Sequence, residues 1–215
     1  MANISPRSLE ELSELAPALE GVKAFMGFIP NSMLTMAHMP QLTLAFSMLS
    51  STVFGADLKA LVSQLTPLIP DQEDAADNLP PHLVQLIALA TSVSSGCRYC
   101  QSHTSHNAVK FGVSDDKLNA LLGYAESSLY SHAEKAVLDL AFAAGEVPNG
   151  STPAHFEALR THFNDRQLTQ IVAVISLFGF LNRWNDTVAT TLEAAPRDFA
   201  EAALDSLQWQ VGKHA

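Results

Sequence analysis

Cys97 and Cys100, the two cysteines of the chain, are separated by two residues and form its most reactive feature. A thiolate attacks peroxides and disulfides far better than a thiol, and unpaired N–H groups in the first turn of a helix lower a thiol pKa. Residues three apart on a helix lie about 60° apart around its axis, close enough for the two sulfurs to form a disulfide. The spacing therefore predicts a reversible dithiol couple, with metal binding or inert packing as the alternatives.

Two histidines continue the same three-residue spacing. His103 follows Cys100 by one helical turn, so its imidazole can polarise that thiol or move its proton. His106 follows three residues later. Successive steps rotate in one direction, so Cys97 and His106 lie on opposite faces of the helix, and the four side chains cannot share one metal ion. Because no second CxxC and no distant HxxxH occurs, we expect no metal and no cofactor.

The elements that position these residues are predicted to be helices. Apolar residues recur at helical spacing and alternating patterns are nearly absent, which indicates an all-α fold. An apolar face begins at His82 and ends at Ser94-Ser95-Gly96, the cysteine motif opens the next helix, and Gly112 closes it. The remaining predicted helices are Glu10–Leu19, Asn31–Met39 with Asn31 as N-cap, Gln41–Val53, Asp57–Leu68, Ser114–Leu122, one after the capping box Ser131–Glu134, one after Thr152-Pro153, Asp165–Thr191 and Asp198–Val211.

An acidic, proline-flanked stretch at 71–81 is predicted to be an exposed connection. It separates an N-terminal helical arm, 1–70, from a core unit, 82–215. A shift of 85 positions lays Cys97–Cys100 over Asn182–Asn185, so we consider an internal helical repeat alongside a chance similarity of apolar helices.

Composition excludes several classes of protein. With 215 residues, 47% hydrophobic and 16% charged, the chain is long and apolar enough to bury a core. The net charge of −10 argues against nucleic-acid binding. The apolar run Ile171–Leu181 is shorter than the roughly 20 residues of a membrane span. Because the first residues lack an apolar signal segment, we expect a cytoplasmic protein without membrane contact.

The stretch LVQLIALATSVSSGCRYCQSHTSHNA, 83–108, resembles the carboxymuconolactone decarboxylase and AhpD-like alkylhydroperoxidase superfamily, in particular its peroxidase-related branch with a CxxC pair. Residues 178–187, FGFLNRWNDT, are similar to the C-terminal segment of that branch. The resemblance implies an AhpD-like helical bundle that forms homo-oligomers, with hexamers or trimers common and a dimer also open. It also implies a disulfide cycle in which Cys100 attacks a peroxide and Cys97 resolves. The reductant would be a dithiol, for example a lipoyl group on an adaptor protein.

Two positions depart from the AhpD pattern. Where the pattern has a glutamate, twelve residues before the first cysteine, this chain has Gln85, and a neutral amide cannot act as a base. Where the pattern has a histidine, four residues after the second cysteine, this chain has Thr104, preceded by His103. Gln85 can approach the cysteines only if the chain reverses near Ser94-Ser95-Gly96. His82, about one turn before Gln85, is a candidate substitute base.

These observations lead to one main hypothesis and two alternatives. The main hypothesis is a thiol–disulfide oxidoreductase, a peroxiredoxin-type antioxidant enzyme that reduces hydrogen peroxide or organic hydroperoxides. The first alternative is a lactone decarboxylase, although that branch does not need a CxxC pair. The second is a non-enzymatic, redox-responsive oligomer whose assembly the cysteine pair adjusts.

Overall fold

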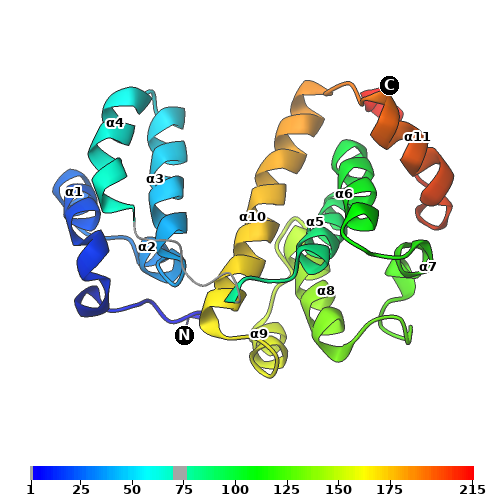
Figure 1. The fold of residues 1–215 in the computed structure, drawn as a ribbon, viewed down its shortest axis with the longest axis horizontal. Helices are drawn as coiled ribbons and strands as arrows, with labels where there is room; N and C mark the ends of the chain where they lie inside the picture. Colours follow the sequence, from blue (N-terminus) through cyan, green and yellow to red (C-terminus); the bar gives the residue numbers. More distant parts are fainter. Residues whose placement is uncertain (1, 70–76) are drawn as a thin grey trace. The chain divides into compact units, whose positions relative to one another are not determined.

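The computed structural model describes residues 2–69 and 77–215, and within these ranges every regular element is helical, which confirms the all-α prediction (Figure 1). The α-helices are α1 (Ala16–Met26), α2 (Asn31–Met36), α3 (Pro40–Val53), α4 (Leu58–Leu65), α5 (Pro81–Ser95), α6 (Arg98–Lys110), α7 (Asp115–Asn119), α8 (His132–Gly145), α9 (Pro153–Arg160), α10 (Asp165–Val188) and α11 (Ala194–Ala203). Short 3₁₀ segments are η1 (Leu9–Leu15), η2 (Thr66–Leu68), η4 (Leu121–Gly123), η5 (Asp205–Leu207) and η6 (Gly212–His214). Over the described ranges, none of the helices combines the length and hydropathy needed to cross a bilayer.

The chain divides into two compact units. Unit 1 comprises Met1–Asn78 with Asp165–Thr169, and unit 2 comprises Leu79–Asn164 with Gln170–Ala215. Residues 70–76 of the acidic connection predicted at 71–81, and of the arm before it, lie outside the described residues. Both cysteines and all the other candidate site residues belong to unit 2.

Unit 1 has its own apolar core. It is built from residues of η1 and α1–α4, and its fully or nearly buried members are Leu12, Leu15, Leu19, Met33, Ala37, Leu44 and Leu65. Two local expectations are wrong in this unit. The predicted helix Glu10–Leu19 is a 3₁₀ segment followed by α1, because the backbone at Leu12 is not helical (φ −113°, ψ 34°). Pro30, not Asn31, is the N-cap of α2, since its carbonyl already accepts the N–H of Met33.

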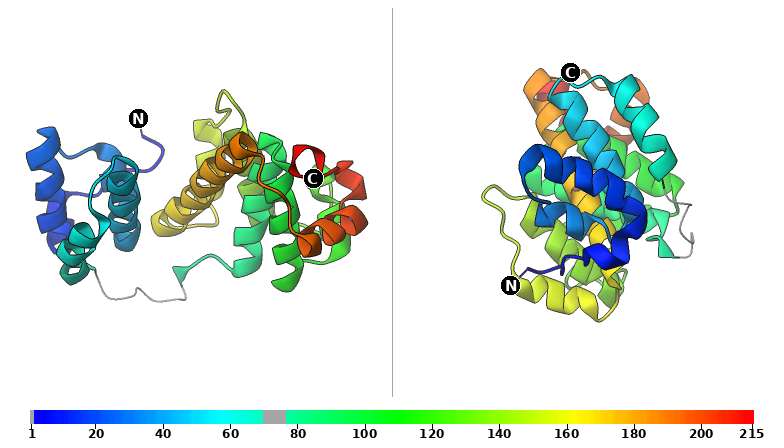
Figure 2. Two further views of the ribbon diagram at one scale, coloured as in Figure 1. Left: turned by 90° about the horizontal axis from the view of Figure 1, so that it is seen from above. Right: turned by 90° about the vertical axis from the view of Figure 1, so that its left-hand side faces the viewer.

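Unit 2 is organised around α5, which packs against α6 and α8 (Figure 1, Figure 2). Its buried side chains include Leu83, Leu86, Ile87, Leu89 and Ala90. α11 packs against α6. A second buried cluster joins this end of the unit to the C-terminal segment through Leu192, Ala200, Leu204, Leu207 and Trp209, with Val93 and Tyr99 packed on it.

The chain reverses between α5 and α6 at Gly96, within the Ser94-Ser95-Gly96 segment where the sequence predicts the first of these helices to end. Gly96 has φ +80°, a left-handed conformation that glycine adopts without a steric penalty. The N–H of Cys97 then returns to the Ser92 carbonyl at 3.1 Å, and Cys97 becomes the N-cap of α6. This turn places the cysteine motif at the last turn of α5.

Other local signals in unit 2 have mixed outcomes. The capping box at Ser131 and Glu134, and the Thr152 cap with Pro153 in the first turn, are confirmed. The last predicted helix, Asp198–Val211, is wrong at both ends, since α11 spans Ala194–Ala203. Pro196 is tolerated in the first helical turn, so the helix begins before it. After Leu204 the chain leaves helical geometry, with Gln208 at φ +49°.

The positive φ of Gly96 leads to a testable prediction. Gly96→Ala should lower the free energy of unfolding by about 1 kcal/mol, because an L-residue is strained at this φ although open space surrounds the site. Urea unfolding followed by circular dichroism measures the change. Gly123→Ala is the matched control, since Gly123 is also surrounded by open space but has no positive φ. Equal effects of the two substitutions would exclude backbone strain as the cause.

Candidate active site

The two thiols lie at the start of α6. Cys97 is the N-cap residue and Cys100 lies in the first turn. Both are free, and they are buried: Cys97 has no exposed surface, whereas Cys100 is 3% exposed. Cys100 is therefore the slightly more exposed of the two buried thiols.

The two thiols are electrostatically unequal. The hydrogen bond that Cys97 donates to Cys100 raises the pKa of Cys97, and burial raises it further. The same hydrogen bond lowers the pKa of Cys100, an amide hydrogen bond from Asn185 adds to this effect, and burial opposes it. Hydrogen bonds donated to a thiolate favour the charged form. Cys100 is thus the thiol poised to ionise, and Cys97 keeps its proton.

α10 contributes two amides to the surroundings of the pair. Asn185 Nδ2 donates to Cys100 Sγ at 3.4 Å, and the Thr190 hydroxyl donates to Asn185 Oδ1 at 2.8 Å, which orients the amide with its N–H groups toward the sulfur. One turn earlier, Asn182 Oδ1 lies 3.2 Å from the Ser92 hydroxyl. Asn182 Nδ2 is buried and has no hydrogen-bond partner among the described residues.

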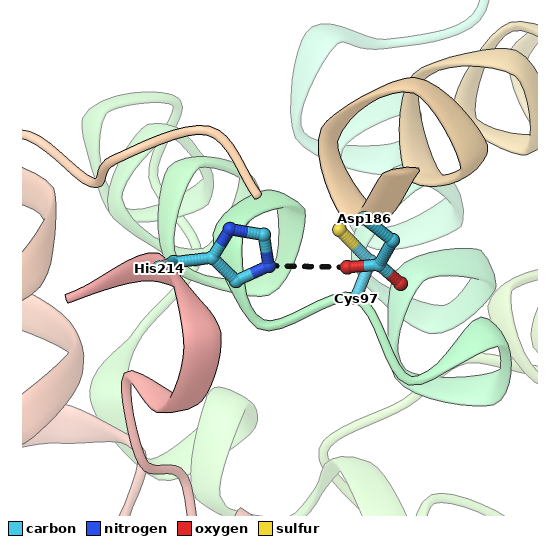
Figure 3. A group of neighbouring side chains, drawn as sticks. All are labelled: Cys97, Asp186 and His214. Atoms are coloured by element: carbon cyan, nitrogen blue, oxygen red, sulfur yellow. Dashed lines mark hydrogen bonds and ion pairs between the residues drawn. The ribbon is translucent and has the colours of Figure 1, made fainter. Parts of the chain in front are cut away.

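A second cluster joins Cys97 to the C-terminal segment. Cys97 Sγ, an Asp186 carboxylate oxygen and a His214 ring nitrogen all lie within 4.8 Å of one another. Figure 3 shows the imidazole pointing at the carboxylate, with the sulfur beside it. His214 Nε2 lies 3.0 Å from Asp186 Oδ1, and Nδ1 lies 2.8 Å from the Thr190 carbonyl oxygen. His214 is buried, whereas Asp186 is 29% exposed.

His103 is paired with a carboxylate. Its Nε2 lies 2.9 Å from Glu193 Oε2, and the Tyr99 hydroxyl donates to Glu193 Oε1 at 3.0 Å. The Tyr99 and His103 rings pack with centroids 4.5 Å apart. Burial, reinforced by the hydrogen bond to Glu193, raises the pKa of Tyr99 to about 12. Among the hydrogen bonds of the described residues, none joins His103 to Cys100.

The candidate base positions Gln85 and His82 lie on α5. His82 Nε2 is 3.7 Å from Glu134 Oε1, which Lys117 Nζ approaches to 2.6 Å. Gln85 is partly buried and lies ten residues before Ser95, about 15 Å along the helix axis. No hydrogen bond within the described ranges joins either side chain to a cysteine.

A cavity of about 720 Å³ lies in unit 2 beside the cluster of Cys97, Asp186 and His214. Its lining is mostly polar and comes from α5, the end of α8, α10 and the C-terminal segment. The lining residues that bear on the site are Asn182, Arg183, Asp186 and Lys213. Asp186 belongs both to the cavity wall and to the cluster, so it connects solvent in the cavity with the buried Cys97.

Several residues of this site are absent from the sequence-based candidates. Two signals in the sequence point at the α10 amides: the similarity that lays Cys97–Cys100 over Asn182–Asn185, and the resemblance of residues 178–187 to the family branch. Asn185 does contact Cys100 from 85 residues away. Asp186 lies in the same 178–187 segment, whereas Glu193 and His214 carry no such signal.

The model of the carboxymuconolactone decarboxylase family matches residues 71–143, which include the CxxC motif. The chain is similar to the debrominase Bmp8, whose crystal structure holds a cysteine-to-alanine variant in complex with 2,3,4-tribromopyrrole. The identity is 31%, the TM-score is 0.56, and the match covers 96% of this chain and 98% of that one. Apo Bmp8 gives the same identity and TM-score. The chain belongs to the carboxymuconolactone decarboxylase family.

Two curated relatives match shorter segments. The uncharacterized protein YdfG of Bacillus subtilis is 28% identical over 47% of this chain and 67% of its own length. The uncharacterized protein YnjA of Escherichia coli is 31% identical over 51% of this chain and 60% of its own length. The match thus spans about two thirds or less of these relatives.

The hydrogen bond from α10 to the sulfur can be tested directly. Asn185→Ala should reduce the thiolate fraction of Cys100 and slow its alkylation by iodoacetamide at pH 7 several-fold. Peptide mass spectrometry measures alkylation at Cys100 alone. Asn182→Ala, one turn earlier on α10 and bonded to Ser92 instead, should leave the rate unchanged. Equal rates in all three proteins would contradict this role of Asn185.

The Glu134 cluster predicts a pH-dependent stability. Burial opposes ionisation of Glu134, but hydrogen bonds from Lys117 and Ser131 outweigh it and lower its pKa. A carboxyl group whose pKa is lower in the folded state stabilises the fold at pH values above its unfolded pKa. This stabilisation is lost as the pH falls through the folded pKa. Glu134→Gln should therefore cost about 2 kcal/mol at pH 7, and the deficit should shrink below about pH 4.5.

Urea unfolding at a series of pH values measures this difference. The exposed Glu157 serves as the control, and Glu157→Gln should change stability by less than about 0.5 kcal/mol. A deficit in Glu134→Gln that stays constant down to pH 3 would show that its carboxylate does not act through ionisation.

Proposed function

We propose that this protein is a dithiol-dependent reductase in which Cys97 and Cys100 cycle between the dithiol and the disulfide while reducing hydrogen peroxide or organic hydroperoxides. The observation that carries the proposal is the asymmetry of the pair. Cys100 receives hydrogen bonds from Cys97 and Asn185, which stabilise its thiolate, while Cys97 holds its proton one helical turn away. Such an arrangement supplies one nucleophile and one resolving thiol.

The cycle has three balanced steps. In the first, the Cys100 thiolate attacks the peroxide, an S–O bond forms as the O–O bond breaks, and the leaving alkoxide takes a proton to become an alcohol or water. In the second, the Cys97 sulfur attacks the Cys100 sulfenic acid, the S–S bond forms, and the hydroxyl group leaves as water. In the third, an external dithiol, such as a lipoyl group on an adaptor protein, reduces the disulfide by exchange and becomes oxidised itself.

The burial of the pair favours a small oxidant. Cys100 is 3% exposed and Cys97 is fully buried. The cavity beside the cluster has a mostly polar lining. Hydrogen peroxide and short hydroperoxides suit both features, because they are small and make several hydrogen bonds.

Proton transfer needs groups other than the family glutamate. We assign His103, one turn after Cys100 on α6, to deliver the proton to the leaving alkoxide, with Glu193 holding the opposite charge beside its ring. Gln85 cannot replace that glutamate, because a neutral amide does not act as a base. The ion-pair contact of His82 with Glu134 supports a structural part in that cluster.

A second candidate is reductive dehalogenation of a brominated aromatic compound. The likeness to Bmp8 over nearly the whole of both chains favours it. In that reaction the dithiol would be oxidised to the disulfide, and its two electrons with one proton would replace bromine by hydrogen while bromide leaves with the second proton. The family description alone supports the lactone decarboxylase alternative, and that reaction gives the CxxC pair no role.

Self-association is part of the proposal. Leu177, Phe180, Trp184 and Val188 recur at helical spacing on α10, and each is between 43% and 58% exposed. A contiguous apolar stripe of this kind is a typical protein contact surface, which supports a homo-oligomer. The non-enzymatic alternative shares this expectation and differs in predicting no turnover.

The proposal is tested by dithiol-dependent peroxide consumption. Cys100→Ser should reduce the rate by about a hundredfold or more, because the nucleophile is lost. The Cys97→Ser variant should consume one peroxide per chain and then stop, because no thiol resolves the Cys100 sulfenic acid. Dimedone should trap this sulfenic acid, and peptide mass spectrometry detects the product. Undiminished turnover in Cys100→Ser would overturn the proposal.

The second candidate uses the same proteins and a different readout. Dithiol-dependent release of bromide from 2,3,4-tribromopyrrole, without peroxide turnover, would make dehalogenation the better assignment. A reversible disulfide with altered oligomer size and neither turnover would identify the non-enzymatic alternative.

A further inference from the structure

Three different metal-binding side chains converge on one point in unit 2. Cys97 Sγ, an Asp186 oxygen and a His214 nitrogen lie within 4.8 Å of one another, although they come from the N-cap of α6, from α10 and from the C-terminal η6. Ligand atoms around a tetrahedral zinc ion are separated by roughly 3.3–3.6 Å. The limit of 4.8 Å exceeds this spacing by only about 1 Å, so a small adjustment of the side chains would close the set around an ion.

The surroundings of His214 orient it as a ligand. A backbone carbonyl only accepts hydrogen bonds, so the 2.8 Å contact with the Thr190 carbonyl assigns the proton to Nδ1. Nε2 then directs its lone pair at Asp186 Oδ1, 3.0 Å away, and two acceptors at this distance need a proton or a cation between them. The N–H of Leu192 also donates to the His214 carbonyl at 2.8 Å, which holds the backbone of the residue. A second hydrogen bond on the far nitrogen is the usual device that orients a metal-binding histidine.

The donor set selects a class of ion. A thiolate, an imidazole and a carboxylate together are typical of zinc and disfavour magnesium or calcium, which prefer oxygen ligands. Asp186 is 29% exposed and lines the cavity, so ions have an entry path and a water molecule can complete the coordination. Lys213 Nζ lies 3.5 Å from Asp186 Oδ1 and must give way, which its 53% exposed side chain permits.

We propose that the reduced protein binds one zinc-class divalent ion through Cys97, Asp186 and His214, and that the Cys97–Cys100 disulfide excludes it. Binding replaces the Cys97 S–H bond with a metal–sulfur bond and releases the proton. Formation of the disulfide removes the thiolate, so the ion leaves. The binding stands on the geometry alone, whereas the exclusion rests on the proposed function. The bound ion would hold Cys97 back from resolving the sulfenic acid and so restrain the cycle.

Cobalt titration of the full chain, reduced with a phosphine and stripped of metal, tests the site. One equivalent of Co²⁺ should give a thiolate charge-transfer band and the visible bands of tetrahedral coordination, and Zn²⁺ should displace it. Cys97→Ser should lose the charge-transfer band. His214→Gln and Asp186→Asn should weaken binding at least about tenfold. Cys100→Ser should keep both the band and the stoichiometry, because Cys100 is outside the ligand set.

Two further variants keep the test decisive. His162→Gln, at an exposed histidine, is the matched control and should bind as the unaltered chain does. The Lys213→Gln variant should bind Co²⁺ several-fold more tightly, because the substitution removes the cation beside Asp186. Since this variant keeps all three ligands, it tests the site even if the His214 variant fails to fold. The absence of a cobalt band in the reduced chain, or its persistence in Cys97→Ser, would overturn the proposal.

The exclusion of the ion by the Cys97–Cys100 disulfide has its own readout. After peroxide treatment, mass spectrometry of the peptide that carries Cys97 and Cys100 reports the disulfide, and cobalt absorption reports the metal. Loss of the band together with disulfide formation is the expected result. Cobalt bound to a chain with a proven disulfide would overturn the exclusion. If no disulfide forms, the proposed function fails while the metal site is still judged by the reduced chain.

Discussion

The last turn of α5 supports the whole site through the backbone and hydroxyl of Ser92. Its carbonyl accepts the N–H of Cys97 and Nε2 of Gln101, both at 3.1 Å, and its hydroxyl lies between the Ala88 carbonyl and Asn182 Oδ1. These contacts tie α5, α6 and α10 together at one residue that has no exposed surface. An apolar side chain here would remove the hydroxyl contact with the buried Asn182 Oδ1, whereas the two hydrogen bonds to the backbone carbonyl do not depend on the side chain.

Because Ser92 fixes the start of α6, the two neighbouring cysteines face different groups, and their pKa values shift in opposite directions. Cys97 caps the helix and faces Asp186 and His214, while Cys100, one turn on, meets the Asn185 amide. The carboxylate disfavours a thiolate on either sulfur, but the amide and the partner thiol favour it on Cys100. One thiol is therefore prepared for ionisation and the other for retention of its proton or for a cation, within a single helical turn.

The sequence was sufficient where the determining interactions are local. The end of α5 at Gly96 and the capping box of Ser131 depend on a few neighbouring residues, so composition and spacing reveal them. The predicted start of the last helix is wrong, because a proline is accepted in a first turn and α11 begins two residues before Pro196. The site beyond the CxxC motif needed tertiary packing: Asn185 meets Cys100 from 85 residues away, and His214 reaches Cys97 only because the C-terminal segment folds back under the Leu192–Trp209 cluster.

The indole of Trp209 gives this site an optical property. Its Nε1 donates to the carbonyl of Arg98, between the two cysteines, at 3.1 Å, and the ring is buried. The other tryptophan, Trp184, is 58% exposed. Because a disulfide quenches a nearby excited indole more strongly than a pair of thiols, the fluorescence of the unmodified chain should change as the pair is oxidised. A buried indole emits at a shorter wavelength than a solvated one, so under the proposed cycle the emission of Trp209 would report the redox state of the pair separately from Trp184.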